Sequence, residues 1–389
     1  MSSLKPIKVA VVTEGISHFE VPLYRLCSQS DDIDLRVFYL LKTEGEGRYC
    51  KDYQKKITWG EDMLSGYVSE LCSCAKELRK EVYRWEPDVA MVYGYSWQGA
   101  IPFIISNRLR NIPQIHRGTL NYYKDPRRGV KADIMRPFRN IVFNLFQAHH
   151  YGGSYSKYVL KHAGISEKQM FFVPYSIDTH FFLNESDKEE IAAEAVKLRD
   201  SLGWGNDAKV MLFICQHNWF KGPDIAMQVF SELQAQYPQM KALIVGSGRM
   251  TEEMKQSAKQ NLIDGSYFFA GFCPSKETVK YYLASDAVLF TSRYETWARA
   301  VNEAMLCKKI CVVNDHIPAA GGLVDNGKNG YVVPGTDDIE VYVSALKHYF
   351  LLPEQDQKAM AERARATACD FSYEKNLDEL RKSILFAAK

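Results

Sequence analysis

Two carboxylates, Glu295 and Glu303, lie eight positions apart in the segment RYETWARAVNEAM, which runs from Arg293 to Met305. A carboxylate at Glu295 could accept hydrogen bonds from sugar hydroxyls and one at Glu303 from ribose hydroxyls, each strengthened by the negative charge. The alternative is that both are ordinary acids on a solvated helix face. Which interpretation holds depends on the elements around them.

The segment follows a hydrophobic run at 287–291 that is typical of a buried strand. Residues 292–295 then form the expected loop, and 296–307 the expected helix. Glu295 and Glu303 should lie along one side of that helix, some 80° apart at about 100° per residue, with Arg299 between them. The backbone N–H groups at the helix N-terminus are free to bind anionic oxygens; they belong to Thr296, Trp297 and Ala298.

Lys221 follows another strand-like run and precedes Gly222 and Pro223, a residue suited to the first position of a helix. A cation at the positive end of a helix is unexpected unless an anion is bound there as well. We therefore expect Lys221 to bind a phosphate group.

A glycine-containing loop, Gly246-Ser-Gly248-Arg249, follows a strand and leads into a helix. Its backbone N–H groups could receive a nucleotide base or a phosphate. Ordinary turn chemistry explains a G-x-G sequence as well.

The first strand-to-helix loop holds a single glycine, Gly15, which could let a nucleotide or acceptor approach or could serve as a simple turn residue. A nicotinamide-binding loop would need G-x-G-x-x-G at this place, so the dehydrogenase reading is weak. The acidic pair Asp32 and Asp34 precedes its strand, and the nine cysteines form no zinc-ligand pattern. We expect no metal and no cofactor, and the free thiols favour a reducing cytosol.

The segment 124–146 combines basic and apolar residues. Six cations and two acids lie between Lys124 and Arg139, and apolar residues follow at helical spacing as far as Leu145. The pattern fits a helix on a membrane surface or a core-packed helix with a solvated basic edge.

The fold class is α/β. With 389 residues the chain should form two domains, and its 46% hydrophobic content, 25% charged content and net charge of +2 fit a globular protein with no general affinity for nucleic acid. Strand-like runs alternate with helical segments, as in doubly wound parallel sheets. The expected strands are 7–12, 35–41, 89–93, 114–117, 148–152, 169–173, 210–215, 242–245, 267–270, 287–291, 310–313 and 331–333. The expected helices include 225–236, 252–260, 276–283, 341–351, 357–367 and 373–386.

We expect two Rossmann-like domains, 1–178 and 179–365, that face each other across a cleft. The segment 366–389 should carry a C-terminal helix that crosses back to the first domain. No signal-peptide pattern opens the sequence and no apolar run is long enough to span a bilayer. The expected location is cytoplasmic, with peripheral contact to the inner membrane face through 124–146 left open.

RYETWARAVNEAM resembles the E-x7-E motif of the retaining GT-B glycosyltransferases, in particular family 4 (glycosyl transferases group 1). KALIVGSG, FFAGFCPSKETVKYYLASDAVLFTSRYE and VDNGKNGYVVPGTD are similar to second-domain segments of that family in order and spacing. GGSYSKYVLKHAGISEKQMFFVPYSID is similar to the stretch that joins its two domains. The resemblance covers residues 150–340 and extends only loosely to the first domain.

The resemblance implies a nucleotide-diphosphate sugar held mainly by the second domain. Lys221 would contact the diphosphate, Glu295 the donor sugar and Glu303 the ribose, while the 246–248 loop and the backbone around Phe272 would border the nucleoside. The acceptor would enter from the first domain, near Gly15 and His116, with Arg117 as an alternative to His116. A packed histidine is the other interpretation of His116.

Three positions depart from the family pattern. Gln216, with His217 beside it, occurs where the family usually has an arginine, so Arg249 or Arg299 would have to meet the charge of the leaving group. Ala298 and Arg299 occur where the motif more often has a glycine and an apolar residue.

The leading functional hypothesis is a retaining, metal-independent hexosyltransferase of polysaccharide or lipopolysaccharide biosynthesis. It would use a UDP- or GDP-sugar and a hydroxyl acceptor on a glycan or glycolipid, by front-face displacement. The alternatives are a sugar-nucleotide epimerase or a phosphorylase of the same fold, and a degenerate GT-B module that binds without turnover.

Overall fold

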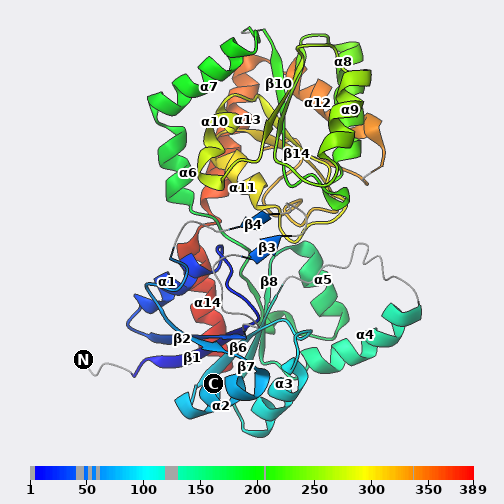
Figure 1. The fold of residues 1–389 in the computed structure, drawn as a ribbon. Coiled ribbons are helices and arrows are strands. Elements are labelled where there is room, and N and C mark those ends of the chain that lie inside the picture. The colour runs from blue at the N-terminus through cyan, green and yellow to red at the C-terminus, as the bar shows by residue number, and fades with distance from the viewer. Residues whose placement is uncertain are drawn as a thin grey trace. The chain divides into compact units, whose positions relative to one another are not determined.

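The computed structural model describes residues 5–40, 48–50, 55–57, 62–118, 130–205, 207–335 and 337–389. The chain divides into two compact units, each built on its own parallel sheet. The first comprises Met1–Tyr49, Lys56–Ser176 and Tyr373–Lys389, and the second comprises Cys50–Lys55 and Ile177–Ser372. The expected class of fold, with two Rossmann-like parallel sheets, is confirmed (Figure 1).

The sheet of the first unit has the strand order β5-β2-β1-β6-β7-β8-β9, and every recorded pairing is parallel. Its strands are β1 (Ile7–Thr13), β2 (Ile33–Leu40), β5 (Val68–Cys72), β6 (Val89–Tyr93), β7 (Gln114–Arg117), β8 (Ala148–Tyr151) and β9 (Met170–Phe172). The short strands β3 (Arg48–Cys50) and β4 (Lys55–Ile57) form a separate two-stranded sheet. The sequence did not predict β3, β4 or β5.

Helices cover both faces of the first sheet. They are α1 (Val21–Ser28), α2 (Ala75–Trp85), α3 (Ala100–Leu109), α4 (Val130–Phe143), α5 (Ser154–His162) and α14 (Tyr373–Ala387). Val9 and Val11 of β1 pack in one cluster with residues of α1 and α14, while Ala10 and Val12 pack in another with residues of α2 and α3. Because β1 is buried on both faces from Val9 to Val12, these four residues form a continuous apolar run.

Helix α14 belongs to the first unit although it follows the second in the chain. Leu377, Leu380, Ile384 and Ala387 lie in the same hydrophobic cluster as β1 and β2, and Figure 1 shows this helix against the sheet. The helix therefore crosses back to the first domain, as the sequence predicted.

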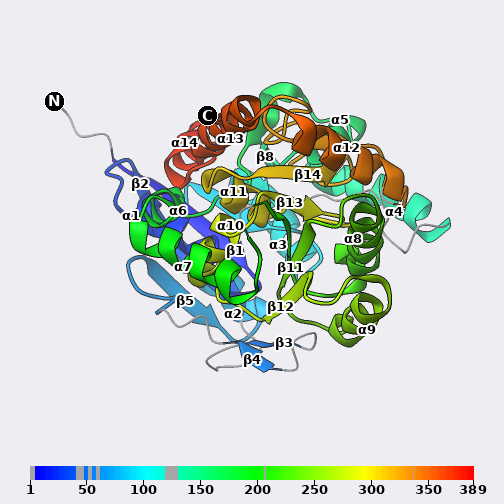
Figure 2. The same cartoon turned by 90° about the horizontal axis from the view of Figure 1, so that it is seen from above.

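The second unit has a six-stranded sheet of order β12-β11-β10-β13-β14-β15. Its strands are β10 (Lys209–Ile214), β11 (Met240–Val245), β12 (Tyr267–Gly271), β13 (Ala287–Phe290), β14 (Ile310–Asn314) and β15 (Tyr331–Val333). Its helices are α6 (Thr179–Ser186), α7 (Glu189–Ser201), α8 (Pro223–Gln236), α9 (Thr251–Asn261), α10 (Val279–Leu283), α11 (Arg299–Leu306), α12 (Ile339–Leu351) and α13 (Glu354–Cys369). Helix α8 packs against β11 and against α9, and Figure 2 shows these two helices side by side next to the sheet.

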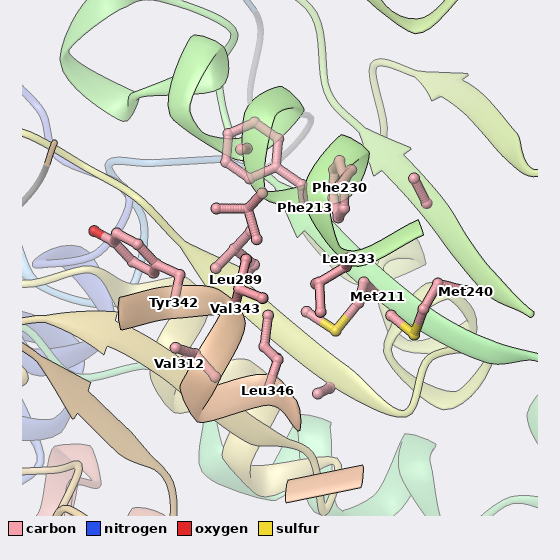
Figure 3. Close-up of a cluster of buried hydrophobic side chains, with 14 of the residues drawn as sticks. Met211, Phe213, Phe230, Leu233, Met240, Leu289, Val312, Tyr342, Val343 and Leu346 are labelled. Carbon is pink, nitrogen blue, oxygen red and sulfur yellow. The ribbon is translucent and has the colours of Figure 1, made fainter. Parts of the chain in front are cut away.

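One core joins the second sheet to α8 and α12. Figure 3 shows Met211 and Leu289 of the sheet in one cluster with Phe230 and Leu233 of α8 and with Val343 and Leu346 of α12. The aliphatic and aromatic residues at i, i+3 and i+4 along α8 give it the apolar stripe that this packing requires.

Two expected helices begin later than predicted. A 3-10 turn at Ser275–Glu277 precedes α10, and α11 starts at Arg299 rather than at 296. Ala298 stops the second helix from extending backward because its φ of 70° is left-handed. Glu295 therefore lies in a loop and not on the helix that carries Glu303.

Candidate functional site in the second unit

The order of strands in the second sheet reverses between β10 and β13, since β11 and β12 lie on one side and β14 and β15 on the other. In open parallel sheets, ligands bind beyond the carboxyl ends of the strands at such a reversal. The loop after β10 carries Lys221, and the loop after β13 carries Glu295. The topology thus brings together two residues that are 74 positions apart.

Lys221 and Glu295 form an ion pair through Nζ and Oε1, and their side chains are 20% and 10% exposed. The carboxylate of Glu295 also accepts hydrogen bonds from the Ser292 hydroxyl, at 3.4 Å, and from the Thr296 N–H, at 3.3 Å. Glu295 therefore places one negative charge beside Lys221, and phosphate binding by Lys221 stays a prediction. A lysine and a carboxylate held together offer a charge for phosphate and an acceptor for hydroxyl groups.

The two loops can approach because residue 222 is a glycine. Its φ is 67°, and a Cβ there would overlap the carbonyl oxygen of Thr291. The Thr291 hydroxyl donates to the Gly222 carbonyl at 2.7 Å. Pro223 occupies the first position of α8, as predicted.

Arg293 braces the same two loops, a role that the sequence did not reveal. Its guanidinium donates to both carboxylate oxygens of Asp224, at 2.7 and 2.6 Å, and to the Trp219 carbonyl at 3.0 Å. Its backbone N–H donates to the Phe220 carbonyl at 2.8 Å. Burial alone would raise the pKa of Asp224, but the hydrogen bonds from Arg293 hold that pKa below its ordinary value. The segment before Lys221 is thus fixed before any ligand binds.

Thr296 and Trp297, which were expected to begin a helix, lie before it. The Trp297 indole is buried and donates from Nε1 to Asn302 Oδ1 at 2.8 Å, while Thr296 is exposed and precedes the helix. Because α11 begins at Arg299 with Ala298 as its N-cap, Thr296 and Trp297 precede the helix, and the prediction that they present helix-end N–H groups is wrong.

Glu303 is buried in α11, with only 6% of its surface exposed. Burial raises the pKa of its carboxyl group, while Arg299 and a hydrogen bond from Tyr282 oppose this rise. The Tyr282 hydroxyl lies 2.9 Å from Oε2, and Arg299 Nη2 lies 4.0 Å from Oε1. The pairing of Arg299 with Glu303 agrees with their predicted common side, whereas Glu295 lies outside that helix.

The remaining second-unit candidates surround these loops. Gln216 is partly buried at the end of β10, Arg249 is exposed before α9, and Phe272 is 54% exposed after β12. All three follow carboxyl ends of strands in the second sheet.

Candidates in the first unit

His116 lies on β7 and is packed among aromatic rings. Its ring centroid is 5.1 Å from that of Phe143 and 5.4 Å from that of Phe146, and only 1% of the residue is exposed. Burial lowers the pKa of His116 to about 4. The packed interpretation of His116 therefore agrees with the structure, and its buried ring is not placed to contact a substrate.

Arg117 forms a buried ion pair with Glu20 of the β1–α1 connection. The guanidinium lies 2.8 Å from Oε1, and their side chains are 4% and 2% exposed. It also donates to the Tyr93 hydroxyl at 2.8 Å and to the Val173 carbonyl at 3.2 Å. These contacts occupy the guanidinium, so Arg117 is a structural residue and its prediction as a catalytic residue is not supported.

Gly15 follows β1, where the order of the first sheet reverses between β1 and β6. Apart from its chain neighbours, no heavy atom of the described residues lies within 4 Å of the position that a Cβ would take there. The space required for a ligand to approach is present, and its use stays a prediction.

The sequence also bears on a metal site, membrane-spanning helices and the basic segment 124–146. Within the described ranges, no three His, Cys, Asp or Glu side chains are grouped to hold a metal ion, and no helix has the length and apolar character needed to cross a membrane. Lys124, Arg127 and Arg128 lie outside the described residues. In α4, Phe138 and Ile141 are 41% and 65% exposed.

Relatives of the chain

Residues 195–367 match the family described as Glycosyl transferases group 1. The matched region includes every site residue described above for the second unit.

Curated relatives carry related names. The chain is 29% identical over 220 residues to a D-inositol 3-phosphate glycosyltransferase of Corynebacterium jeikeium, covering 54% of this chain and 50% of that protein. It is 33% identical over 197 residues to the enzyme of the same name from Corynebacterium urealyticum, covering 48% and 46%. The matched region thus spans about half the length of these relatives.

The likeness of folds extends over almost the whole chain. A crystal structure of Anabaena HepE in complex with UDP has a TM-score of 0.71 and 17% sequence identity, covering 97% of this chain and 100% of that chain. The chain therefore shares the two-domain fold of that structure.

Proposed function

We propose that the chain transfers a hexose from a nucleotide-diphosphate sugar, with UDP or GDP as the nucleotide, to a hydroxyl of a glycan or glycolipid acceptor. The observation that carries the proposal is the Lys221–Glu295 pair at the strand reversal of the glycosyltransferase domain. Support also comes from solved structures of the same fold that contain UDP and UDP-glucose.

In the proposed reaction, the bond between the sugar C1 and the diphosphate oxygen breaks while a bond from the acceptor oxygen to C1 forms on the same face. The acceptor proton passes to an oxygen of the departing diphosphate, and the anomeric configuration is retained. Lys221 stabilises the negative charge on the leaving group. Glu295 accepts hydrogen bonds from the hydroxyls of the donor sugar, and Glu303 accepts hydrogen bonds from the hydroxyls of the ribose.

The proposed reaction uses no metal. Lys221 already provides a cation at the N-terminus of α8, where the helix dipole favours an anion. Adding EDTA should leave the rate unchanged, and a strict requirement for Mg²⁺ or Mn²⁺ would contradict this part of the proposal.

The test begins with a thermal-shift screen of nucleotide sugars, followed by an assay of nucleotide release with candidate acceptors. Lys221→Ala and Glu295→Gln should each abolish transfer and leave the protein folded. Lys255→Ala, which breaks an exposed ion pair with Glu252 in the same unit, is the matched control. Near-normal transfer by either site variant would exclude the assignment.

Two other functions give different results in the same assay. An epimerase would convert the nucleotide sugar without an acceptor, whereas a transferase releases nucleotide only when the acceptor is added. A non-catalytic module would bind the nucleotide sugar without releasing nucleotide; Gln216, Ala298 and Arg299, the departures from the family pattern, motivate this alternative.

We further propose that α4 contacts an anionic membrane surface. Exposed Phe138 and Ile141 lie on the same helix as exposed Arg136, a combination that suits the interface of a bilayer. Flotation with anionic vesicles at low salt should recover the wild type, and Ile141→Asp should reduce the recovery. A wild type that does not float would exclude the contact.

A further inference from the structure

The loops after β10 and β11 are joined along their backbones. The His217 N–H donates to the Ser247 carbonyl at 3.0 Å, and the Met250 N–H donates to the His217 carbonyl at 3.0 Å. A Cβ at Gly246 would overlap the carbonyl oxygen of Cys215, and one at Gly248 would overlap the backbone of His217. The two glycines therefore serve the close packing of one loop on the other.

Both glycine N–H groups are already used inside the protein. The Gly246 N–H donates to the Gly271 carbonyl at 2.7 Å, and the Gly248 N–H donates to Thr251 Oγ1 at 2.9 Å. The expectation that these two groups receive a base or a phosphate is therefore wrong. The loop can recognise a ligand by the shape of a fixed surface, which depends on what holds the loop in place.

A short chain of side-chain hydrogen bonds holds it. Thr251 Oγ1 lies 3.0 Å from His217 Nδ1 and accepts the Gly248 N–H. Because the N–H can only donate, the hydroxyl oxygen accepts there and its own hydrogen is available to Nδ1. His217 is fully buried, and burial lowers its pKa to about 4. The ring is neutral near pH 7 and can accept this hydrogen bond.

We propose that His217 and Thr251 are positioning residues that fix the 246–248 loop as a preformed wall for the nucleoside part of the donor. This inference rests on the proposed function. Loss of the Thr251 hydroxyl leaves the Gly248 N–H without its acceptor and frees the loop to move. Losing this hydroxyl should weaken binding of the nucleoside. It should not affect the transfer step, because neither His217 nor Thr251 belongs to the Lys221–Glu295 pair.

The experiment compares Thr251→Val with Thr251→Ser, which keeps the hydroxyl. Binding of UDP and UMP, and of GDP and GMP in parallel, is measured by calorimetry with the full chain. Thr251→Val should raise the dissociation constants of the diphosphate and of the monophosphate by the same factor. The expected factor is about tenfold, equivalent to about 1.4 kcal/mol. Thr251→Ser should stay within about twofold of the wild type, and with an active donor Thr251→Val should raise KM while kcat changes little.

Thr367→Val is the matched control. The Thr367 hydroxyl also makes two hydrogen bonds, to the Arg363 carbonyl at 2.9 Å and from Asn329 at 3.1 Å, and it lies on α13. This variant should lose stability without losing affinity. If Thr251→Val does not fold, Thr251→Ala removes the same oxygen.

The outcomes separate the two proposals. If Thr251→Val binds UDP and UMP as tightly as the wild type, the positioning role is overturned and the proposed function is not affected. The same conclusion follows if this variant loses affinity for the diphosphate but not for the monophosphate. A wild type that binds none of the four nucleotides would overturn the proposed function and the inference with it.

Discussion

Removing one partner of the buried Glu20–Arg117 pair should destabilise the first unit strongly. Three contacts of 2.8 to 3.2 Å join the guanidinium to the carboxylate, and both side chains are almost completely buried. Glu20→Gln leaves the guanidinium without a counter-charge, and breaking a buried pair in this way costs about 3–5 kcal/mol. For a unit of this size, the midpoint of thermal unfolding should fall by about 6–20 °C.

Two further variants separate the charge from the packing. Glu20→Leu combined with Arg117→Met should recover most of the lost stability, because an apolar pair of similar volume carries no buried charge. Glu70→Gln breaks the Arg36–Glu70 pair on the same sheet, whose side chains are 30% and 32% exposed, and it should cost less than about 1 kcal/mol. Calorimetric midpoints measure all three. A Glu20→Gln variant within about 1 kcal/mol of the wild type would refute this reasoning.

For three other changes, the structure predicts whether stability or nucleotide binding rises or falls. Ala298→Gly should raise the free energy of unfolding by about 1 kcal/mol, because glycine adopts a φ of 70° without strain; a lower melting temperature would contradict this. The pKa of His116 is lowered to about 4, below the ordinary 6.5. The unfolded chain therefore takes up the proton first, and the wild type should lose up to about 3 kcal/mol of stability between pH 6.5 and 4. His116→Phe should flatten this dependence in denaturant titrations at several pH values, and an unchanged slope would count against it. Gly246→Ala should lower the midpoint of thermal unfolding or abolish nucleotide binding in calorimetry, because its Cβ overlaps the Cys215 carbonyl. Gly205→Ala should leave both measurements unchanged, because no described residue other than its chain neighbours has an atom within 4 Å of the added Cβ.

The strands of both sheets were predictable where they are buried on both faces. Strands such as β1 and β10 contain uninterrupted apolar runs, Val9–Val12 and Val210–Ile214, and flanking polar turns set their ends. The edge strand β5 was missed because Val68 and Leu71 are exposed, so its sequence lacks such a run. Lys221 and Glu295 could be placed after strands, but only the strand order shows that their loops meet.

Other features of the site had little or no signal in the sequence. The left-handed backbone at Ala298 was not predicted, because alanine normally favours a continued helix; the glycine that the family motif more often has at this position was the one indication of it. The pairing of Arg117 with Glu20 joins residues 97 positions apart, so the sequence did not indicate that this arginine, at the end of an expected strand, is held in a buried ion pair. Thr251 gave a weak signal in hindsight, because a threonine three residues after Gly248 can accept its N–H.

The packing of α14 against β1 and β2 has a consequence for how the protein is made. During synthesis, the ribosome completes the whole of the second unit before it reaches Tyr373. Until then Val9, Val11 and Leu35 lack the helix that covers them, so the first unit waits with an incomplete core while the second can already fold. Domains usually fold in the order in which they are translated. Here the unit that is translated first should be the last to reach its final stability, and the nascent chain exposes an apolar sheet face to chaperones throughout that interval.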